Sequence, residues 1–300
     1  LMRQVVRRPA PPGVESRREQ ALRIARHAQG WTAPTVPAPD ADGEGAARVR
    51  LHVFLLGFPR SGTTLLEKAL AGHPECITLQ ETDPLGAVAD ALVAPGALER
   101  LARLPTPEAD RARAAYWAAV GPLAAAGGGR PVLVDKLPLN SVRLPVIARL
   151  FPAARIVFAV RDPRDVVLGC YRRRFRLNGA MAEFLSLQGT AEYYAAAMQI
   201  GAAARRHLPL AMHVVRHEDV VADFDTQLHG VLRFLGLGWN AQVRDIAARA
   251  TGRAVTPSDL QLRGGLRADG VGTWRRHAAR LRDVQPLLAP WVEAFGYPPD

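Results

Sequence analysis

The chain has 300 residues, of which 48% are hydrophobic and 22% are charged. These values describe a globular protein of one large domain or two small ones, and they exclude a disordered chain. The first 20 residues are rich in arginine and proline without an apolar centre, so we expect no secretory signal. The apolar run at 53–56 is too short to span a membrane. Two cysteines exclude a disulfide framework and a cysteine-based zinc site, and they favour a reducing, cytoplasmic location.

The formal net charge is +11 at pH 7, and Lys68 and Lys136 are the only lysines. One explanation is coding bias in a GC-rich genome, with the charge spread over a solvated surface. The other is an anionic ligand, because the guanidinium fork suits phosphate and sulfate. No dense basic stripe is interleaved with aromatic residues, so we expect no nucleic-acid partner. No spacing of histidines and carboxylates indicates a metal site.

Residues 1–47 are predicted to be an N-terminal extension and linker. Within them, 17–29 has the spacing of an amphipathic helix, and 31–45 is rich in Pro, Ala, Asp and Gly, as linkers are. The globular domain is predicted to occupy 48–300. The segment 256–273 is irregular and rich in glycine, and a long loop inside a compact domain is often functional.

Short apolar runs in this domain predict buried strands at 49–57, 131–134, 155–160 and 212–215. Helical spacing between and after them predicts helices at 63–72, 141–150, 165–175, 181–207, 223–235 and 284–295. This alternation predicts an α/β, P-loop-like three-layer fold, with a central, mainly parallel sheet flanked by helices. Ligands of such folds bind at the carboxyl ends of the strands.

The turn after the first strand has the composition of an anion-binding loop. Its residues are Gly57, Phe58, Pro59, Arg60, Ser61, Gly62, Thr63 and Thr64. Backbone N–H groups at a helix start bind anions, and the hydroxyls and Arg60 add donors. A nucleotide triphosphatase has Gly-Lys where this chain has Gly62-Thr63, so ATP or GTP hydrolysis is disfavoured. The alternative is a plain strand–turn–helix connection with capping hydroxyls.

Two more segments carry cations at strand ends. Arg161 follows the strand 155–160 and precedes Asp162-Pro163, so its side chain is expected to face the ligand crevice. Asp162-Pro163 is by itself typical of a helix N-terminus. Lys136 follows the strand at 131–134 in a chain otherwise rich in arginine, which favours a role specific to lysine. The alternative for Lys136 is an ion pair with Asp135.

With these motifs in this order, residues 53–298 resemble the sulfotransferases that use 3′-phosphoadenosine 5′-phosphosulfate (PAPS). The loop, written GFPRSGTTLLE, is most similar to bacterial members that often follow tetratricopeptide repeats and to tyrosylprotein sulfotransferases. The resemblance implies transfer of a sulfuryl group from PAPS to an acceptor, without a metal. It also implies cofactor contacts from the loop and from more distant positions. These positions are Pro59, Arg60, Ser61, Gly62, Thr63 and Thr64 at the 5′-phosphosulfate, Arg161 and Arg173 at the 3′-phosphate, His217 near the adenine, and Ser258 and Arg267 in the C-terminal loop.

The resemblance implies catalytic roles for Glu81, Lys136 and Arg60. Glu81, in the segment Leu79-Gln80-Glu81-Thr82, matches the catalytic base of the family, and a carboxylate there can accept the proton of the acceptor. Lys136 and Arg60 would stabilise the charge that develops on the leaving phosphate. The alternative for Glu81 is a surface carboxylate at a helix start.

Three positions depart from the family pattern by removing polar side chains. Gly169 and Gly270 stand where serine is usual, and Thr273 stands where a basic residue is common. Arg263, Arg267 or Arg275 compensates, or the cofactor site is weakened. Two alternative functions therefore remain open, namely a kinase or nucleotide hydrolase of the P-loop class and an inactive nucleotide-binding homologue. The sequence indicates neither the oligomeric state nor the acceptor, which could be a small molecule, a glycan or a peptide.

Overall fold

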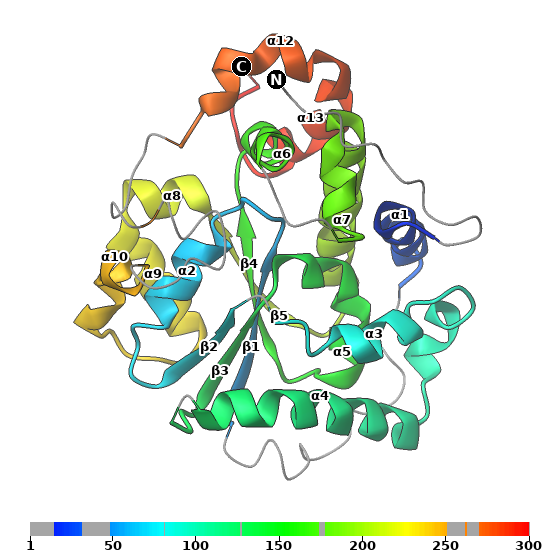
Figure 1. Cartoon of the computed structure of the whole chain (residues 1–300), viewed down its shortest axis with the longest axis vertical. Helices are drawn as coiled ribbons and strands as arrows, with labels where there is room; N and C mark the ends of the chain where they lie inside the picture. Colours follow the sequence, from blue (N-terminus) through cyan, green and yellow to red (C-terminus); the bar gives the residue numbers. More distant parts are fainter. Residues whose placement is uncertain are drawn as a thin grey trace.

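The computed structural model describes residues 15–31, 49–80, 82–126, 128–173, 178–250, 262 and 270–299. A five-stranded sheet forms the centre of this part of the chain, in the order β2-β3-β1-β4-β5, and every neighbouring pair is parallel (Figure 1). The predicted α/β class is confirmed. The strands are β1 (Leu51–Gly57), β2 (Cys76–Gln80), β3 (Val132–Lys136), β4 (Arg155–Val160) and β5 (Ala211–Arg216).

Helices cover both faces of the sheet. Alternate side chains of a strand point to opposite faces, so each strand contributes to the core on both sides. In β1, Phe54 and Leu56 pack into one hydrophobic cluster, while Val53 and Leu55 pack into another. The second cluster includes α2 (Thr63–Leu70), α8 (His217–Ala222), α9 (Phe224–Phe234) and α10 (Ile246–Arg249). The first includes α4 (Thr106–Ala126), α5 (Leu144–Leu150), α6 (Pro163–Arg172), α7 (Leu187–His207) and α13 (Gln285–Ala294).

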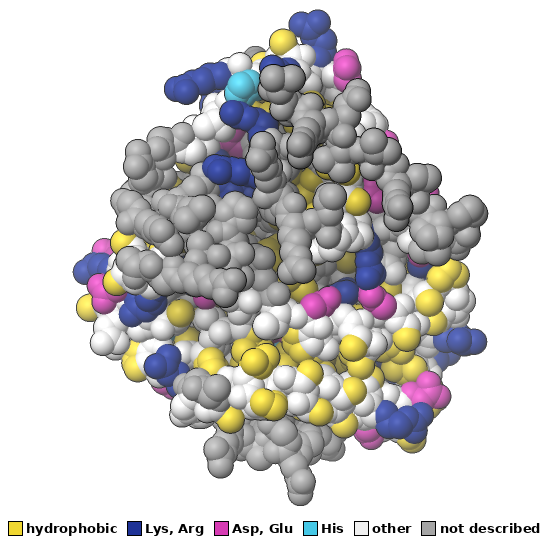
Figure 2. Space-filling model, viewed as in Figure 1, with side chains coloured by type: hydrophobic (Ala, Val, Ile, Leu, Met, Phe, Trp, Pro, Cys, Tyr) yellow, Lys and Arg dark blue, Asp and Glu magenta, His cyan; other side chains and the backbone are white. Residues whose placement is uncertain are grey.

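Short helices fill the connections between these elements. They are α3 (Gly86–Leu92), η2 (Leu98–Arg103), η3 (Pro138–Arg143), η4 (Met181–Leu185), η5 (Ala241–Arg244), η6 (Thr273–His277), α12 (Ala278–Leu281) and η7 (Arg282–Val284). No helix in the described part of the chain is long and apolar enough to cross a membrane. On the face drawn in Figure 2, the Lys and Arg side chains that are described lie scattered and form no continuous stripe.

Helix α1 (Arg17–Ala28) is held to the body of the protein by its apolar face and by ion pairs. It begins with a capping box, in which Ser16 accepts from the backbone N–H of Glu19 and the Glu19 carboxylate accepts from that of Ser16. Its buried face packs against α7, and Arg18 pairs with Glu192 of α7 at 2.8 Å. The predicted helix at 17–29 is confirmed, whereas the division of the chain at residue 48 stays a prediction.

A buried chain of hydrogen bonds links β1, α4 and β3. The Tyr116 hydroxyl donates to Oδ2 of Asp135 at 2.9 Å and lies 2.8 Å from Nε2 of His52. Burial raises the pKa of Asp135 to about 7 and lowers that of His52 to about 3. Adjacent residues of a strand point to opposite faces, so this network leaves Lys136 on the other face of β3 from Asp135.

Replacement of Tyr116 by Phe is expected to lower the free energy of unfolding by about 1–3 kcal/mol, because it leaves two buried polar atoms without their partner. Urea unfolding followed by circular dichroism measures the change. Tyr171→Phe, on α6, is the matched control and is expected to change stability by less than about 0.5 kcal/mol. Equal effects of the two substitutions would show that the buried network contributes nothing.

Candidate functional site

The loop between β1 and α2 lies at the carboxyl edge of the sheet and is shaped by two glycines. A Cβ atom on Gly57 would lie 2.5 Å from the carbonyl oxygen of Ala159 in β4, so only glycine fits there. Gly62 has a φ of 93° and is the N-cap of α2, with no side-chain hydrogen bond to the first turn. The N–H groups of that turn are therefore not satisfied by a capping side chain, as an anion site requires.

Arg60 is the one non-glycine residue with a positive φ among the described residues, at 76°. L-residues rarely adopt this conformation, and they persist in it only where the surroundings fix them. Burial, together with the charges of Arg173 and Arg161, lowers the pKa of Arg60 to about 10. Arg60 remains charged at neutral pH, and like charges from Arg173 and Arg161 act on it beside the loop.

Arg161 directly follows β4, as the sequence predicts, and its side chain is largely buried. One Nη donates to the carbonyl oxygen of Arg60 at 3.4 Å, and the other donates to the carbonyl oxygen of Gly270. The Asp165 carboxylate lies 3.5 Å from the guanidinium. The site is therefore built from segments about a hundred residues apart. Arg173, at the end of α6, is exposed.

His217, the first residue of α8, lies against the loop. A Cβ atom on Gly62 would lie 2.5 Å from Nδ1 of His217, so the imidazole occupies the space that a side chain at 62 would need. This Nδ1 is buried and has no hydrogen-bond partner among the described residues. Burial and the nearby charges of Arg161 and Arg60 lower the pKa of His217 to about 3. The imidazole is neutral at pH 7.

Lys136 is fully buried at the end of β3. In the sheet register it lies between Leu55 of β1 and Gln80 of β2. Lys68 of α2 donates to the side-chain oxygen of Gln80 at 3.2 Å and lies 3.5 Å from the buried carboxylate of Glu67. The sequence prediction missed β2. The structure thus places both lysines of the chain beside the last residue of this strand.

The three departures from the family pattern have defined surroundings. A Cβ atom on Gly169 would lie 3.5 Å from Cβ and Cγ of Arg60, so this glycine faces the Arg60 side chain. Gly270 contributes its carbonyl oxygen to Arg161. The Thr273 hydroxyl donates to Oδ1 of Asp165 at 2.8 Å.

The C-terminal segment is held in place by three residues at the start of α6, namely Asp162, Arg164 and Asp165. The sequence did not predict this role. Arg164 forms a bidentate pair with Asp162, donates to the carbonyl oxygens of Pro298 and Pro299, and lies 3.7 Å from the centre of the Trp274 ring. Asp165 accepts the backbone N–H groups of residues 272 and 274. The predicted helix N-terminus is also present, because the Asp162 side chain caps α6 at the N–H of Arg164.

Four residues singled out in the sequence lie outside the described residues, namely Glu81, Ser258, Arg263 and Arg267.

The loop residues that are described are mostly buried, with Ser61, Thr63 and Thr64 each at most 5% exposed. The Pro59 carbonyl oxygen accepts from the thiol of Cys170, 3.2 Å away. Within the described ranges, no group of three or more His, Cys, Asp and Glu side chains is arranged to hold a metal ion.

Comparison with known proteins identifies the family. The model of the sulfotransferase family matches residues 52–241, more than half of the chain. The chain belongs to the sulfotransferase family. It is 26% identical over 283 residues to an uncharacterised protein of Aquifex aeolicus, covering 90% of this chain but only 36% of that protein. It is 25% identical over 268 residues to protein-tyrosine sulfotransferase 2 of Gallus gallus, covering 82% of this chain and 69% of the relative.

Solved structures of sulfotransferases share the fold. The sulfotransferase domain of the olefin synthase from Synechococcus PCC 7002 superposes with a TM-score of 0.58 at 23% identity, over 87% of this chain and 98% of that domain. A sulfotransferase from Mycobacterium avium superposes with a TM-score of 0.50 at 13% identity, over 94% of this chain and 84% of the other. These identities support the architecture of the sulfotransferase domain alone.

The strained backbone of Arg60 predicts an unusual order of stability among its variants. Arg60→Gly is expected to be more stable than Arg60→Ala by about 1 kcal/mol, because glycine adopts positive φ without the Cβ clash. The order should reverse at Arg111, on the exposed face of α4, where glycine is about 1 kcal/mol worse than alanine. Chemical unfolding of the four variants tests this, and the same order at both positions would contradict the strain at Arg60.

The lowered pKa of His217 predicts a pH-dependent stability. The folded protein keeps this imidazole neutral, while the unfolded chain binds a proton below about pH 6.5, so stability falls as the pH decreases below that value. His217→Gln should reduce this loss by up to about 1.4 kcal/mol per pH unit. Urea unfolding at pH 7.5 and 5.5 measures it, with His207→Gln on α7 as the matched variant. Identical pH profiles for the two variants would show that His217 is not held neutral.

Proposed function

We propose that this member of the sulfotransferase family transfers a sulfuryl group from PAPS to an acceptor hydroxyl or amine by in-line displacement. The observation that carries the proposal is the meeting of Arg161 with Arg60, whose carbonyl oxygen it contacts at 3.4 Å, on a loop whose helix start has no capping side chain. Such a site suits a ligand with several negative charges. PAPS supplies a phosphosulfate for the loop and a 3′-phosphate for Arg161 and Arg173.

The residues of the loop would hold the reacting end of the cofactor. The N–H groups at the start of α2 and the hydroxyls of Ser61, Thr63 and Thr64 would bind its oxygens. Arg60 would neutralise charge beside them. His217, neutral and with a buried unpartnered nitrogen, offers a hydrogen bond without adding repulsion to the arginines. We assign Ser258 and Arg267 to the same cofactor on the family resemblance alone.

The chemical step exchanges one bond at sulfur for another and transfers one proton. The acceptor oxygen or nitrogen forms a bond to sulfur while the bond between sulfur and the bridging oxygen breaks, and the adenosine 3′,5′-bisphosphate (PAP) leaves. We propose that Glu81 accepts the proton of the acceptor and that Lys136 and Arg60 stabilise the negative charge on the departing phosphate. We expect no metal to be needed, because these side chains supply the positive charge.

The acceptor is proposed only by chemical class. Candidates are a small molecule, a glycan or a peptide, and each would use the same cofactor half. The similarity to a protein-tyrosine sulfotransferase makes a tyrosine-containing peptide the first acceptor to assay. A P-loop kinase or hydrolase is disfavoured, because Thr63 stands where such enzymes carry the loop lysine. An inactive homologue would bind PAP without turnover.

Calorimetric titration with PAP, run beside ATP and adenosine 5′-phosphosulfate, tests the cofactor assignment. We expect micromolar or tighter binding of PAP and weaker binding of the two nucleotides that lack a 3′-phosphate. Arg161→Ala should weaken PAP binding at least tenfold, because it removes a charged contact to that phosphate. Arg172→Ala, eleven residues later on α6, is the matched control. A preference for ATP would instead support the P-loop kinase class.

Single-turnover transfer from PAPS to an active acceptor tests the catalytic roles. Glu81→Gln and Lys136→Ala are expected to lower the rate about 10²-fold or more, while PAP binding is retained. Arg111→Ala is the matched control, because it removes a cation from the exposed face of α4, outside the residues assigned to the site. Near-wild-type rates for both variants would remove Glu81 and Lys136 from the mechanism. Binding of PAP without transfer to any acceptor tested would favour the inactive homologue.

A further inference from the structure

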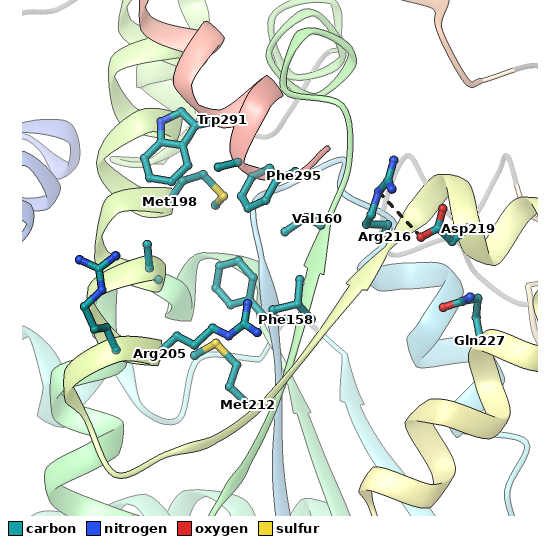
Figure 3. A pocket seen from close by; sticks show the side chains of 15 residues that line it. Phe158, Val160, Met198, Arg205, Met212, Arg216, Asp219, Gln227, Trp291 and Phe295 are labelled. Atoms are coloured by element: carbon teal, nitrogen blue, oxygen red, sulfur yellow. Dashed lines mark ion pairs between the residues drawn. The ribbon is translucent and has the colours of Figure 1, made fainter. Parts of the chain in front are cut away.

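A cavity of about 590 Å³ lies at the β5 edge of the sheet, on the face covered by α7 and α13 (Figure 3). Such a volume is within the usual range for small-molecule sites. Its floor comes from alternate residues of the two last strands, Phe158 and Val160 of β4 and Met212 and Val214 of β5. Met198 of α7 and Trp291 and Phe295 at α13 form an apolar wall around this floor.

Small residues in the covering helices keep this space open. Gly201, Ala202 and Ala294 line the cavity where larger side chains would fill it. A Cβ atom on Gly201 would lie 2.9 Å from the Phe158 ring, so the ring reaches into the space beside α7 only because residue 201 is glycine. Asp219 of α8 and Gln227 of α9 also line the cavity, so it extends around the open edge of β5 toward the helices of the other face.

The polar rim of the cavity is mainly basic. Arg205 and Arg206, in the last turn of α7, are exposed, and neither forms an ion pair with another described residue. Arg216 lies over the Tyr297 ring at 4.5 Å and has a long contact of 3.8 Å with Asp219. Cations in a last helical turn also stabilise the helix, so their position alone does not require a ligand. The apolar floor directly beside them is a second observation, and together the two suit a ligand with an anionic head and an apolar chain.

We propose that this cavity binds an anionic amphiphile with a single alkyl chain, such as a fatty-acid carboxylate. The chain would lie on the apolar floor between β5 and α7, and the carboxylate would pair with Arg205 and Arg206. A second copy of this chain fits less well, because its arginines and its net charge of +11 would repel those of the first copy. The lining includes neither the loop after β1 nor Arg161 nor His217, although Val160 and Arg216 directly precede the last two, so competition with PAP is part of the test.

Calorimetric titration with dodecanoate below its micellar concentration tests the site, with dodecanol as the uncharged match. Dodecanoate is expected to bind at a 1:1 ratio with a micromolar Kd, and dodecanol at least tenfold more weakly. The double variant Arg205→Ala/Arg206→Ala should lose at least tenfold in dodecanoate affinity, and Ala202→Trp should abolish binding by filling the cavity. The control is Arg100→Ala/Arg111→Ala, which removes two exposed arginines far from β5.

Binding of PAP is measured on every variant and in the presence of dodecanoate. Circular dichroism and urea unfolding show that the variants are folded, whatever the outcome for the proposed function. Where the unmodified protein binds PAP, unchanged PAP binding shows that the two sites are separate. The proposal is overturned if folded protein does not bind dodecanoate, if the double variant and its control bind it equally, or if dodecanoate displaces PAP. It is also overturned if Ala202→Trp changes the oligomeric mass while dodecanoate binding persists, because the cavity would then be a contact between copies.

Discussion

The functional edge of this protein depends on holding like charges close together. β1 and β4 are neighbours with Gly57 opposite Ala159, so the loop after one strand and the arginine after the other necessarily meet. Arg60 and Arg161 are brought together by this register, and burial together with the charges of Arg173 and Arg161 lowers the pKa of Arg60. A parallel sheet can sustain such a site because the positive charges face a ligand crevice, where an anion offsets the repulsion.

The carboxylate of Asp165 organises this charge. It faces Arg161 on one side and accepts three hydrogen bonds from residues 272–274 on the other. Arg164 next to it is buried between Asp162, Trp274 and two C-terminal carbonyls. The N-cap and first turn of α6 therefore fix both the cation that the family resemblance assigns to the 3′-phosphate and the path of the C-terminal segment. A substitution in this turn would disturb binding and stability together.

The sequence predicted the elements whose residues carry a strong local pattern. The apolar runs were sufficient to predict β1, β3, β4 and β5, and the amphipathic spacing was sufficient to predict α1. The glycine-rich composition was sufficient to predict the turn after β1. The strand β2 was missed because its five residues combine Cys, Thr and Gln with only two aliphatic side chains. The contacts of Arg164 with Pro298 and of His217 with Gly62 were not predictable, because they join segments more than a hundred residues apart. The positive φ of Arg60 follows from that tertiary setting as well.

The placement of the two lysines supports the proposed mechanism independently of the family resemblance. Apart from histidine, all cationic side chains of the chain are arginine except two. Lys68 donates a hydrogen bond to Gln80, and Lys136 lies beside Gln80 in the sheet. A compact ammonium fits between strands where a planar guanidinium is too wide, and a fully buried charge is costly unless it is paired. Both lysines therefore bring positive charge into the narrow space beside Gln80, the last residue of β2. If Lys136 had only a structural role, an arginine at a less crowded position could fill that role equally well.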